Sequence, residues 1–239
     1  MGGHHPLGVN RCVGEAFLWG ALGASALVVG ALLAYQLALS RRLIAVVMAL
    51  GTGVLIGSVS FELVDDALEH QALVWVAALI LVGALVFTAG DWVLDRHGGE
   101  QRKDASGAQA DGKPLAIVLG LTVLQGRVSV SLLAGIALSN LPEGMSSSSG
   151  LKVAGWPRDR VLLMWTVVVL VSALAAAAGY ATLDPRSSRT GALVQAFAGG
   201  ALLAMLADTL LPEAYEVEGV LTGTLVVIGF AVSLGLSAA

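Results

Sequence analysis

The sequence is poor in charge and in cysteine. Asp, Glu, Lys and Arg make up 13% of its 239 residues, about half of what an ordinary soluble domain carries. Cys12 is the single cysteine, which excludes an intrachain disulfide and a cysteine metal cluster. The formal net charge of −4 is too small to indicate an ionic partner, so we expect no nucleic acid to bind.

Apolar residues dominate the chain instead. They account for 56% of the sequence, and the mean hydropathy is +0.84. Runs of about 20 apolar residues recur, and each is long enough to cross a bilayer as a helix. Strands are not expected, because open sheet edges cannot face lipid. The sequence therefore predicts an all-α, polytopic membrane protein, with residues 1–239 forming one transmembrane domain in the lipid bilayer.

We expect about eight transmembrane helices. They cover residues 13–39, 43–68, 72–94, two segments between 114 and 151, then 161–183, 190–215 and 219–239, with a polar loop at 95–113. The fourth helix is weak, because its apolar part, residues 115–125, would reach only about 16 Å across about 30 Å of hydrocarbon. Either it starts earlier and carries Asp111 into the membrane, or it is a half-helix.

Basic residues indicate the orientation of the chain. The clusters that contain Arg41, Arg96 and Lys152 are expected on the cytoplasmic side by the positive-inside tendency. This arrangement puts the N-terminus outside and requires the short fourth helix to cross. We expect the chain in the cell (inner) membrane of a bacterium.

One internal repeat is visible. Residues 53–69 align with residues 200–216, and with eight spans these two helices run in opposite directions. Inverted repeats of this kind are common in transporters, whose binding site lies near the repeat interface. The alternative is that apolar helices with acidic ends resemble one another by composition alone.

The fifth predicted helix has a polar interruption. Ser139, Asn140 and Glu143 follow an apolar run, and Pro142 lies among them. A carboxylate at this depth costs about 2.5–3.5 kcal/mol on insertion scales unless it faces a partner or a wet cavity. Pro142 has no N–H and frees the carbonyl of Leu138. These oxygens suit a cation, which predicts a cation site. The alternative is that Asn and Ser join helices and that Pro-Glu-Gly marks a helix end.

Two further helices contribute acids. Asp208 lies in an apolar run, and Pro212 frees its carbonyl, so it is a candidate metal ligand. Glu62 is the deepest acid of a stripe that continues to Asp66 and Glu69 and would concentrate cations at a mouth. Asp66 and Glu69 are equally typical of a solvated helix end. The glutamates that follow Pro212 are expected to be solvated.

These residues resemble the ZIP (Zrt/Irt-like) family of divalent metal transporters. The family's fifth helix carries Q-N-x-P-E-G or H-E-x-P-x-E, and S-N-L-P-E-G stands there at residues 139–144. Residues 208–213 match the family's seventh helix, which has an acid, two aliphatics and P-E. Residues 66–69 fit the end of its second helix. The resemblance implies a ZIP-like arrangement of eight helices, an outward N-terminus and a divalent metal ion as substrate.

The chain also departs from the family. Its fourth helix lacks H-N-x-P-E-G, with residues 111–114 as a remnant at best, and its sixth helix has no acid. The resemblance then implies half of a two-metal centre. Its candidate metal ligands are Ser139, Asn140 and Glu143, joined by Asp208, Glu62 or Asp111.

Two functions follow as hypotheses. The leading one is a ZIP-like carrier that moves divalent cations through a midplane site of oxygen ligands. The alternative is a degenerate homologue that does not transport but binds a metal or a partner protein. Zinc prefers His, Cys and carboxylate ligands, whereas an all-oxygen site suits manganese or magnesium. No nucleophile–base pair lies in the spans, so we expect neither an enzyme nor a cofactor, and a homodimer is left open.

Overall fold

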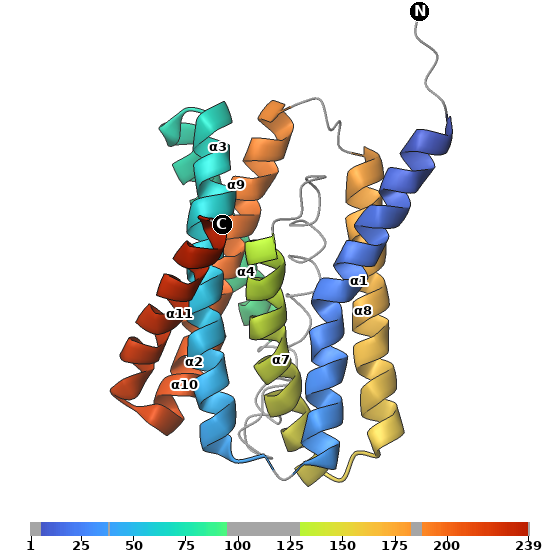
Figure 1. Ribbon diagram of the computed structural model, residues 1–239, viewed down its shortest axis with the longest axis vertical. Helices are drawn as coiled ribbons and strands as arrows, with labels where there is room; N and C mark the ends of the chain where they lie inside the picture. The colour runs from blue at the N-terminus through green and yellow to red at the C-terminus, as the bar shows by residue number, and fades with distance from the viewer. Residues whose placement is uncertain (1–5, 38, 95–129, 183–187, 239) are drawn as a thin grey trace, which may run out of the picture.

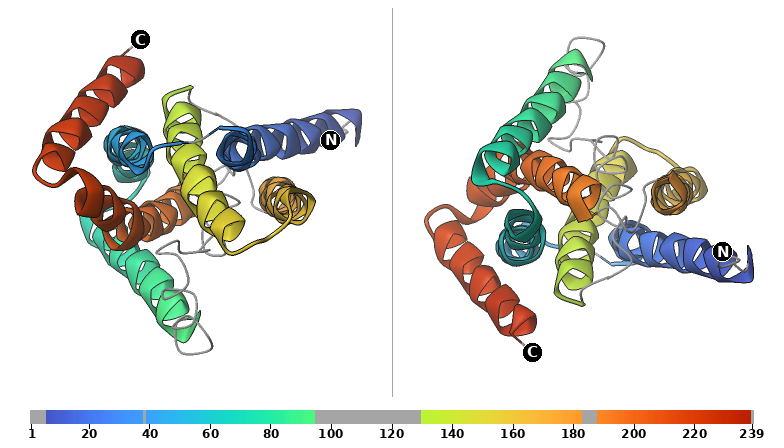
Figure 2. Two further views of the ribbon diagram at one scale, coloured as in Figure 1. Left: turned by 90° about the horizontal axis from the view of Figure 1, so that it is seen from below. Right: turned by 90° about the horizontal axis from the view of Figure 1, so that it is seen from above.

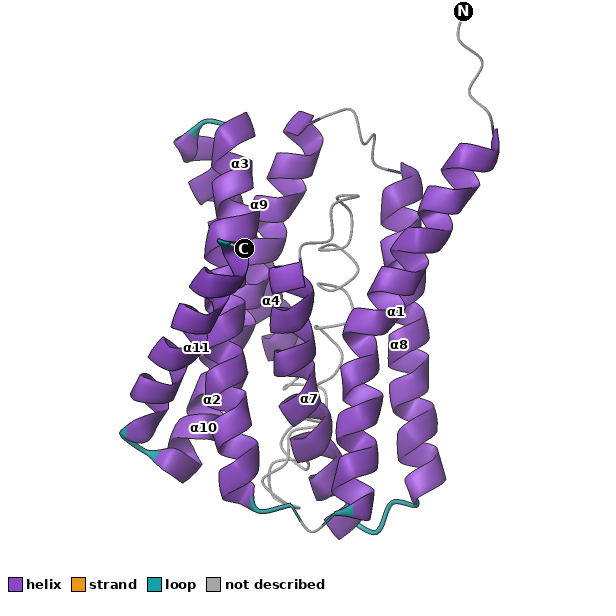
Figure 3. Cartoon of the chain, in the orientation of Figure 1, coloured by secondary structure: helices purple, strands orange, loops and turns teal. Residues whose placement is uncertain are grey.

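The computed structural model describes residues 6–37, 39–94, 130–182 and 188–238, which form helices and no strand (Figure 3). The helices are α1 (Pro6–Gln36), α2 (Arg41–Ser58), η1 (Val59–Val64), α3 (Asp65–His70), α4 (Leu73–Leu94), α7 (Val130–Val153), α8 (Arg158–Thr182), α9 (Ser188–Met205), η4 (Leu206–Leu210), α10 (Leu211–Glu218) and α11 (Leu221–Ser237).

Five helices are long and apolar enough to cross a membrane. They cover residues 13–36, 41–70, 73–93, 158–178 and 189–218. The helix at 221–237 is apolar but shorter. The prediction of an all-α membrane protein is therefore confirmed. The predicted fourth helix, the polar loop at 95–113 and Asp111 lie outside the described residues.

Two of the long helices contain a π-helical segment. α2, η1 and α3 form one continuous helix, and α9, η4 and α10 form another that runs in the opposite direction (Figure 1). In η1 and η4 the backbone N–H reaches back five residues, from Asp65 to the Ser60 carbonyl and from Leu211 to the Leu206 carbonyl. π-Helical segments are rare in proteins, and those that occur are often found at functional sites.

A glycine in a neighbouring helix allows close packing against each of these two long helices. Gly229 of α11 lies against the Leu50 carbonyl of α2, and Gly83 of α4 lies against the Phe197 carbonyl of α9. Leu50 and Phe197 are related by the same offset as the aligned segments of the sequence repeat. A Cβ atom on either glycine would overlap with the facing carbonyl. One hairpin consists of the long helix α2–η1–α3 and the following α4, and the other of α9–η4–α10 and the following α11. The second helix of each hairpin thus packs against the long helix of the other.

α7 lies at the centre of the bundle, between α1 and α2 (Figure 2). Gly30 of α1 lies against the backbone of α7 at Gly144, and Gly51 of α2 lies against the backbone at Leu138. On its other side α1 packs against α8, where Gly20 contacts Ala176. Two sides of α7 are thus used for close helix packing.

Candidate cation site

Asn140 is fully buried, and among the described residues only the nitrogen end of its side-chain amide makes a hydrogen bond. Its Nδ2 atom donates to the Gly23 carbonyl of α1 at 3.0 Å. Because a carbonyl only accepts, this bond fixes which end of the amide is nitrogen. The Oδ1 atom is buried and has no hydrogen-bond partner among the described residues. A buried acceptor without a partner costs about 1–3 kcal/mol, so Asn140 presents an oxygen that a cation could occupy.

Glu143 lies one helical turn after Asn140. Its side chain is half-buried, and its Oε2 atom is buried. Asn140, Glu143 and Ser147 recur at i, i+3 and i+7, so they share one side of α7. Ser147 is buried as well. The prediction that Asn140 and Glu143 face inward therefore agrees with their burial.

Ser139 and the carbonyl freed by Pro142 are engaged elsewhere. Ser139 is buried, and its Oγ atom donates to the Ile136 carbonyl at 3.0 Å. The Leu138 carbonyl faces α2, where a Cβ on Gly51 would lie 2.5 Å from it. This carbonyl therefore supports the close packing of α2 and α7, and our expectation of a carbonyl ligand at this point does not fit its position.

Glu213 is a site residue that sequence reasoning missed. Its Oε1 atom accepts a hydrogen bond from the Ser146 Oγ of α7. Ser146 is one turn beyond Glu143, so this bond brings a carboxylate of α10 close to that of α7. We expected Glu213 to be solvated, but its side chain is half-buried. Its position directly after Pro212, on a predicted ligand helix, was the available signal.

The two π segments each carry one of the acids predicted as ligands. Asp208 lies in η4, and its side chain is exposed. Glu62 lies in η1 and accepts a hydrogen bond from the Ser237 hydroxyl at 3.2 Å.

Helix register shows how far away Glu62 is. Gly135 of α7 lies against Ser58, and Gly51 of α2 lies against Leu138, so the two helices are antiparallel. Glu143 is then level with about residue 47 of α2, which places Glu62 roughly 22 Å further along that helix. One ion cannot bind both carboxylates in this conformation.

Ser172 of α8 is a second residue that sequence reasoning missed. It is fully buried, and its Oγ atom has no partner among the described residues. Trp165, two turns earlier on α8, donates to Ser148 of α7 at 2.9 Å, which puts Ser172 level with Asn140. A lone serine in an apolar helix carries no signal of function, so only the packing could identify it.

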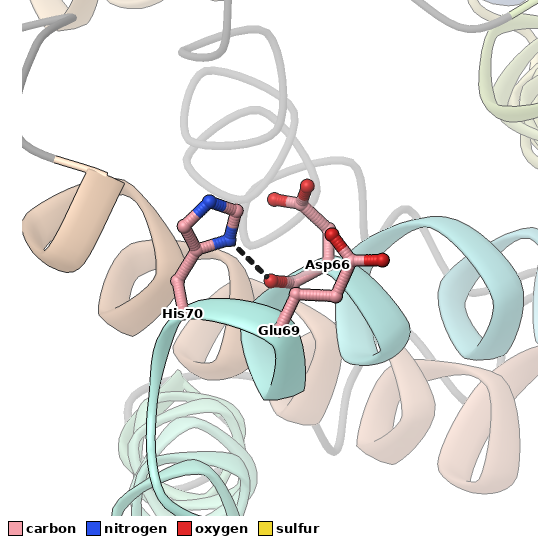
Figure 4. A group of neighbouring side chains, drawn as sticks. All are labelled: Asp66, Glu69 and His70. Atoms are coloured by element: carbon pink, nitrogen blue, oxygen red, sulfur yellow. Dashed lines mark hydrogen bonds between the residues drawn. The ribbon is translucent and has the colours of Figure 1, made fainter.

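A separate group of side chains that could hold a metal ion lies at the end of α3. Asp66, Glu69 and His70 offer ligand atoms that all lie within 4.8 Å of one another (Figure 4). The His70 Nδ1 atom is 2.9 Å from the backbone carbonyl of Asp66. We had predicted the two acids as a stripe or a solvated end and had not considered His70, although its spacing of four residues from Asp66 could have identified it.

No protein-family model matches this chain, and no curated protein is significantly similar to it. The candidate site consequently depends on its own chemistry. The amide, carboxylate and hydroxyl oxygens of Asn140, Glu143 and Ser147 lie on one side of α7, and such oxygens coordinate divalent cations.

Proposed function

We propose that this protein is a ZIP-like carrier that moves a divalent metal cation across a membrane. The observation that carries the proposal is Asn140, whose Oδ1 atom is buried without a partner one turn from Glu143. A bilayer offers no water to such an acceptor. A cation between Asn140 and Glu143 would satisfy the amide oxygen and neutralise the carboxylate.

The surroundings of Asn140 support a cation in preference to another polar group. Ser172 adds a buried hydroxyl at the same level from α8, and Glu213 brings a second carboxylate from α10. The carboxylates balance the charge of a divalent ion, and the neutral oxygens complete its shell. Because all these donors are oxygens, manganese or magnesium suits the site better than zinc does.

The paired hairpins support a carrier mechanism. The long helices run in opposite directions, each with a π segment at the aligned position, and the second helix of each hairpin packs against the other's long helix. Inverted repeats allow one half of a transporter to rock against the other around a midplane site. As part of the proposal, the N-terminus lies outside a bacterial inner membrane.

Uptake into proteoliposomes tests the proposal. The purified protein should take up labelled manganese, and Glu143→Gln should lower the initial rate at least about tenfold by removing a charged ligand of similar shape. Glu216→Gln is the matched control, because Glu216 is exposed at the wet end of α10, and it should change the rate less than about twofold. Equal losses in both variants would show that general acidity attracts the ion, and the proposed site would be wrong.

The second candidate is a degenerate homologue that binds a metal or a partner protein without transport. The lack of the family's fourth-helix motif favours it. Manganese binding that depends on Glu143, together with no uptake above that of protein-free liposomes, would identify this function.

A further inference from the structure

We propose that Asp66, Glu69, His70 and Gln195 form an outer metal site that accepts zinc-like ions before they reach Asn140. The three α3 residues lie at the end of the bundle where α9 begins (Figure 1). Gln195 belongs to α9, which packs against α3. The inference depends on the proposed function only in treating the bound ion as a transport substrate.

Gln195 has the least explained polar side chain in the described part of the chain. It is 3% exposed, and neither Oε1 nor Nε2 has a hydrogen-bond partner there. The aligned position in the first long helix holds Met48, which is buried in the apolar core. The fold therefore accepts an apolar residue at this position, so packing alone does not explain the amide of Gln195.

Helix geometry aims Gln195 toward the α3 group. Ala67 of α3 packs with Ala192 and Ala196 of α9. His70 follows Ala67 by three residues, and Gln195 follows Ala192 by three. Each is thus about 60° around its helix from the contact. Because the helices are antiparallel, these steps lead to the same side of the interface but in opposite directions along it. Since Ala67 packs between Ala192 and Ala196, Gln195 is level with Asp66, and His70 lies about one helical turn further along.

The side that His70 and Gln195 share faces away from α4. α4 contacts α9 through Phe197 and Gly200, which lie on the opposite side of the interface from Gln195. Asp66 precedes Ala67 by one residue and falls on the Gln195 side as well. The buried amide of Gln195 therefore lies on the same side of the interface between α3 and α9 as Asp66 and His70.

The chemistry of the group favours zinc. The carbonyl of Asp66 only accepts, so His70 donates to it through Nδ1 and keeps Nε2 available for a metal. One imidazole nitrogen and two carboxylates are typical zinc ligands, and the two negative charges attract a cation from solution. The outer site thus differs in donor type from the all-oxygen site around Asn140, and it should bind zinc-like ions more tightly than the inner site does.

Titration of the full chain in nanodiscs with zinc chloride tests the inference. His4 and His5 are replaced by alanine throughout, since they could bind zinc themselves. His70→Asn should weaken one class of zinc site at least about tenfold. Val217→Asn, at the aligned position in α10, should change zinc affinity less than twofold. Zinc affinity within twofold of wild type in His70→Asn would overturn the outer site.

Gln195→Met separates ligation from packing, because it installs the residue found at the aligned position. We expect about tenfold weaker zinc binding at the outer site, with a thermal unfolding midpoint equal to or above that of wild type. A lower midpoint with unchanged zinc affinity would make Gln195 a packing residue and would overturn the four-residue site.

Glu143→Gln, titrated separately with zinc chloride and with manganese chloride and assayed for manganese uptake, distinguishes the two proposals. If it removes manganese binding while the His70-dependent zinc site persists, both stand. If it changes neither binding nor uptake while His70→Asn still weakens zinc, the proposed transport site fails and the outer site remains. If it removes manganese binding and His70→Asn has no effect, the outer site fails alone.

Discussion

The two long helices share their packing and differ in their polar chemistry. Leu55, Val59 and Leu63 are buried in the first, and the aligned Leu202, Leu206 and Leu210 are buried in the second. Each helix has its π segment at the same place in this series. The buried apolar positions therefore determine a common backbone shape for both helices.

The polar positions follow a different pattern. Asp66 and Glu69 align with Glu213 and Glu216, but one group contains His70 and the other does not. Glu213 is bonded to α7 through Ser146, whereas the α3 group lies at the end of the bundle. A shared backbone thus carries two different cation environments, because side chains at the helix ends are free of the packing that constrains the middle.

The largest expected effect tests the shared packing. Gly229→Ala should destabilise the protein by about 2–3 kcal/mol, because the added Cβ overlaps with the Leu50 carbonyl and the backbones must separate. Gly83→Ala should have a similar effect at the Phe197 carbonyl. Thermal unfolding in detergent measures both changes. Gly223→Ala is the control in α11, because no atom lies within 4 Å of its Cβ position. Widely different costs for Gly229 and Gly83 would show that the two hairpins are not equivalent.

A smaller effect tests the polar difference. Val217→His completes a group of one histidine and two acids in α10, so we expect one additional zinc ion to bind. Its affinity should be more than about tenfold weaker than at α3, because Glu213 already accepts a hydrogen bond from Ser146. Zinc titration in a His70→Asn background measures it. Affinity equal to that of the α3 group would mean that a histidine and two carboxylates suffice and that Gln195 contributes nothing.

The smallest effect concerns an ion pair between the hairpins. Arg42 Nε lies 3.0 Å from Glu218 Oε1, and the aligned positions hold Arg189 and Gln71. The Arg42 side chain is 74% exposed and the Glu218 side chain is 3% exposed, so solvent screens the pair from the Arg42 side only. Glu218→Gln should cost less than about 1 kcal/mol, and the effect should be smaller in 1 M salt. Gln71→Glu should add no more than that. Thermal unfolding at two salt concentrations measures both, and a salt-independent loss would contradict this account.

Several features could be read from the sequence because they depend on local composition. Long apolar runs require helices in a bilayer, and the seven helices of the described residues lie where apolar periodicity placed them. Asn140 and Glu143 stood out because a carboxylate and an amide are costly at that depth. The alignment of residues 53–69 with 200–216 followed from repeated apolar spacing.

Other features required the folded chain. Pro142 showed that a carbonyl was freed, but only packing shows that Gly51 covers it. The sequence favoured Asp208 as a ligand and predicted a solvated Glu213, and only the folded chain shows that Glu213 is bonded to Ser146 of α7. Ser172 and Gln195 do not stand out in the sequence. The structure shows that their side chains are buried without a hydrogen-bond partner among the described residues.

The sequence by itself determined that this is a helical membrane protein with a costly polar turn in its central helix, because the free energy of placing each residue in lipid depends mainly on that residue. Tertiary structure decided which oxygen atoms lie close together. Their proximity depends on helix register, on glycines that allow close backbone contact and on two π segments. All of these arise from contacts between residues far apart in the chain.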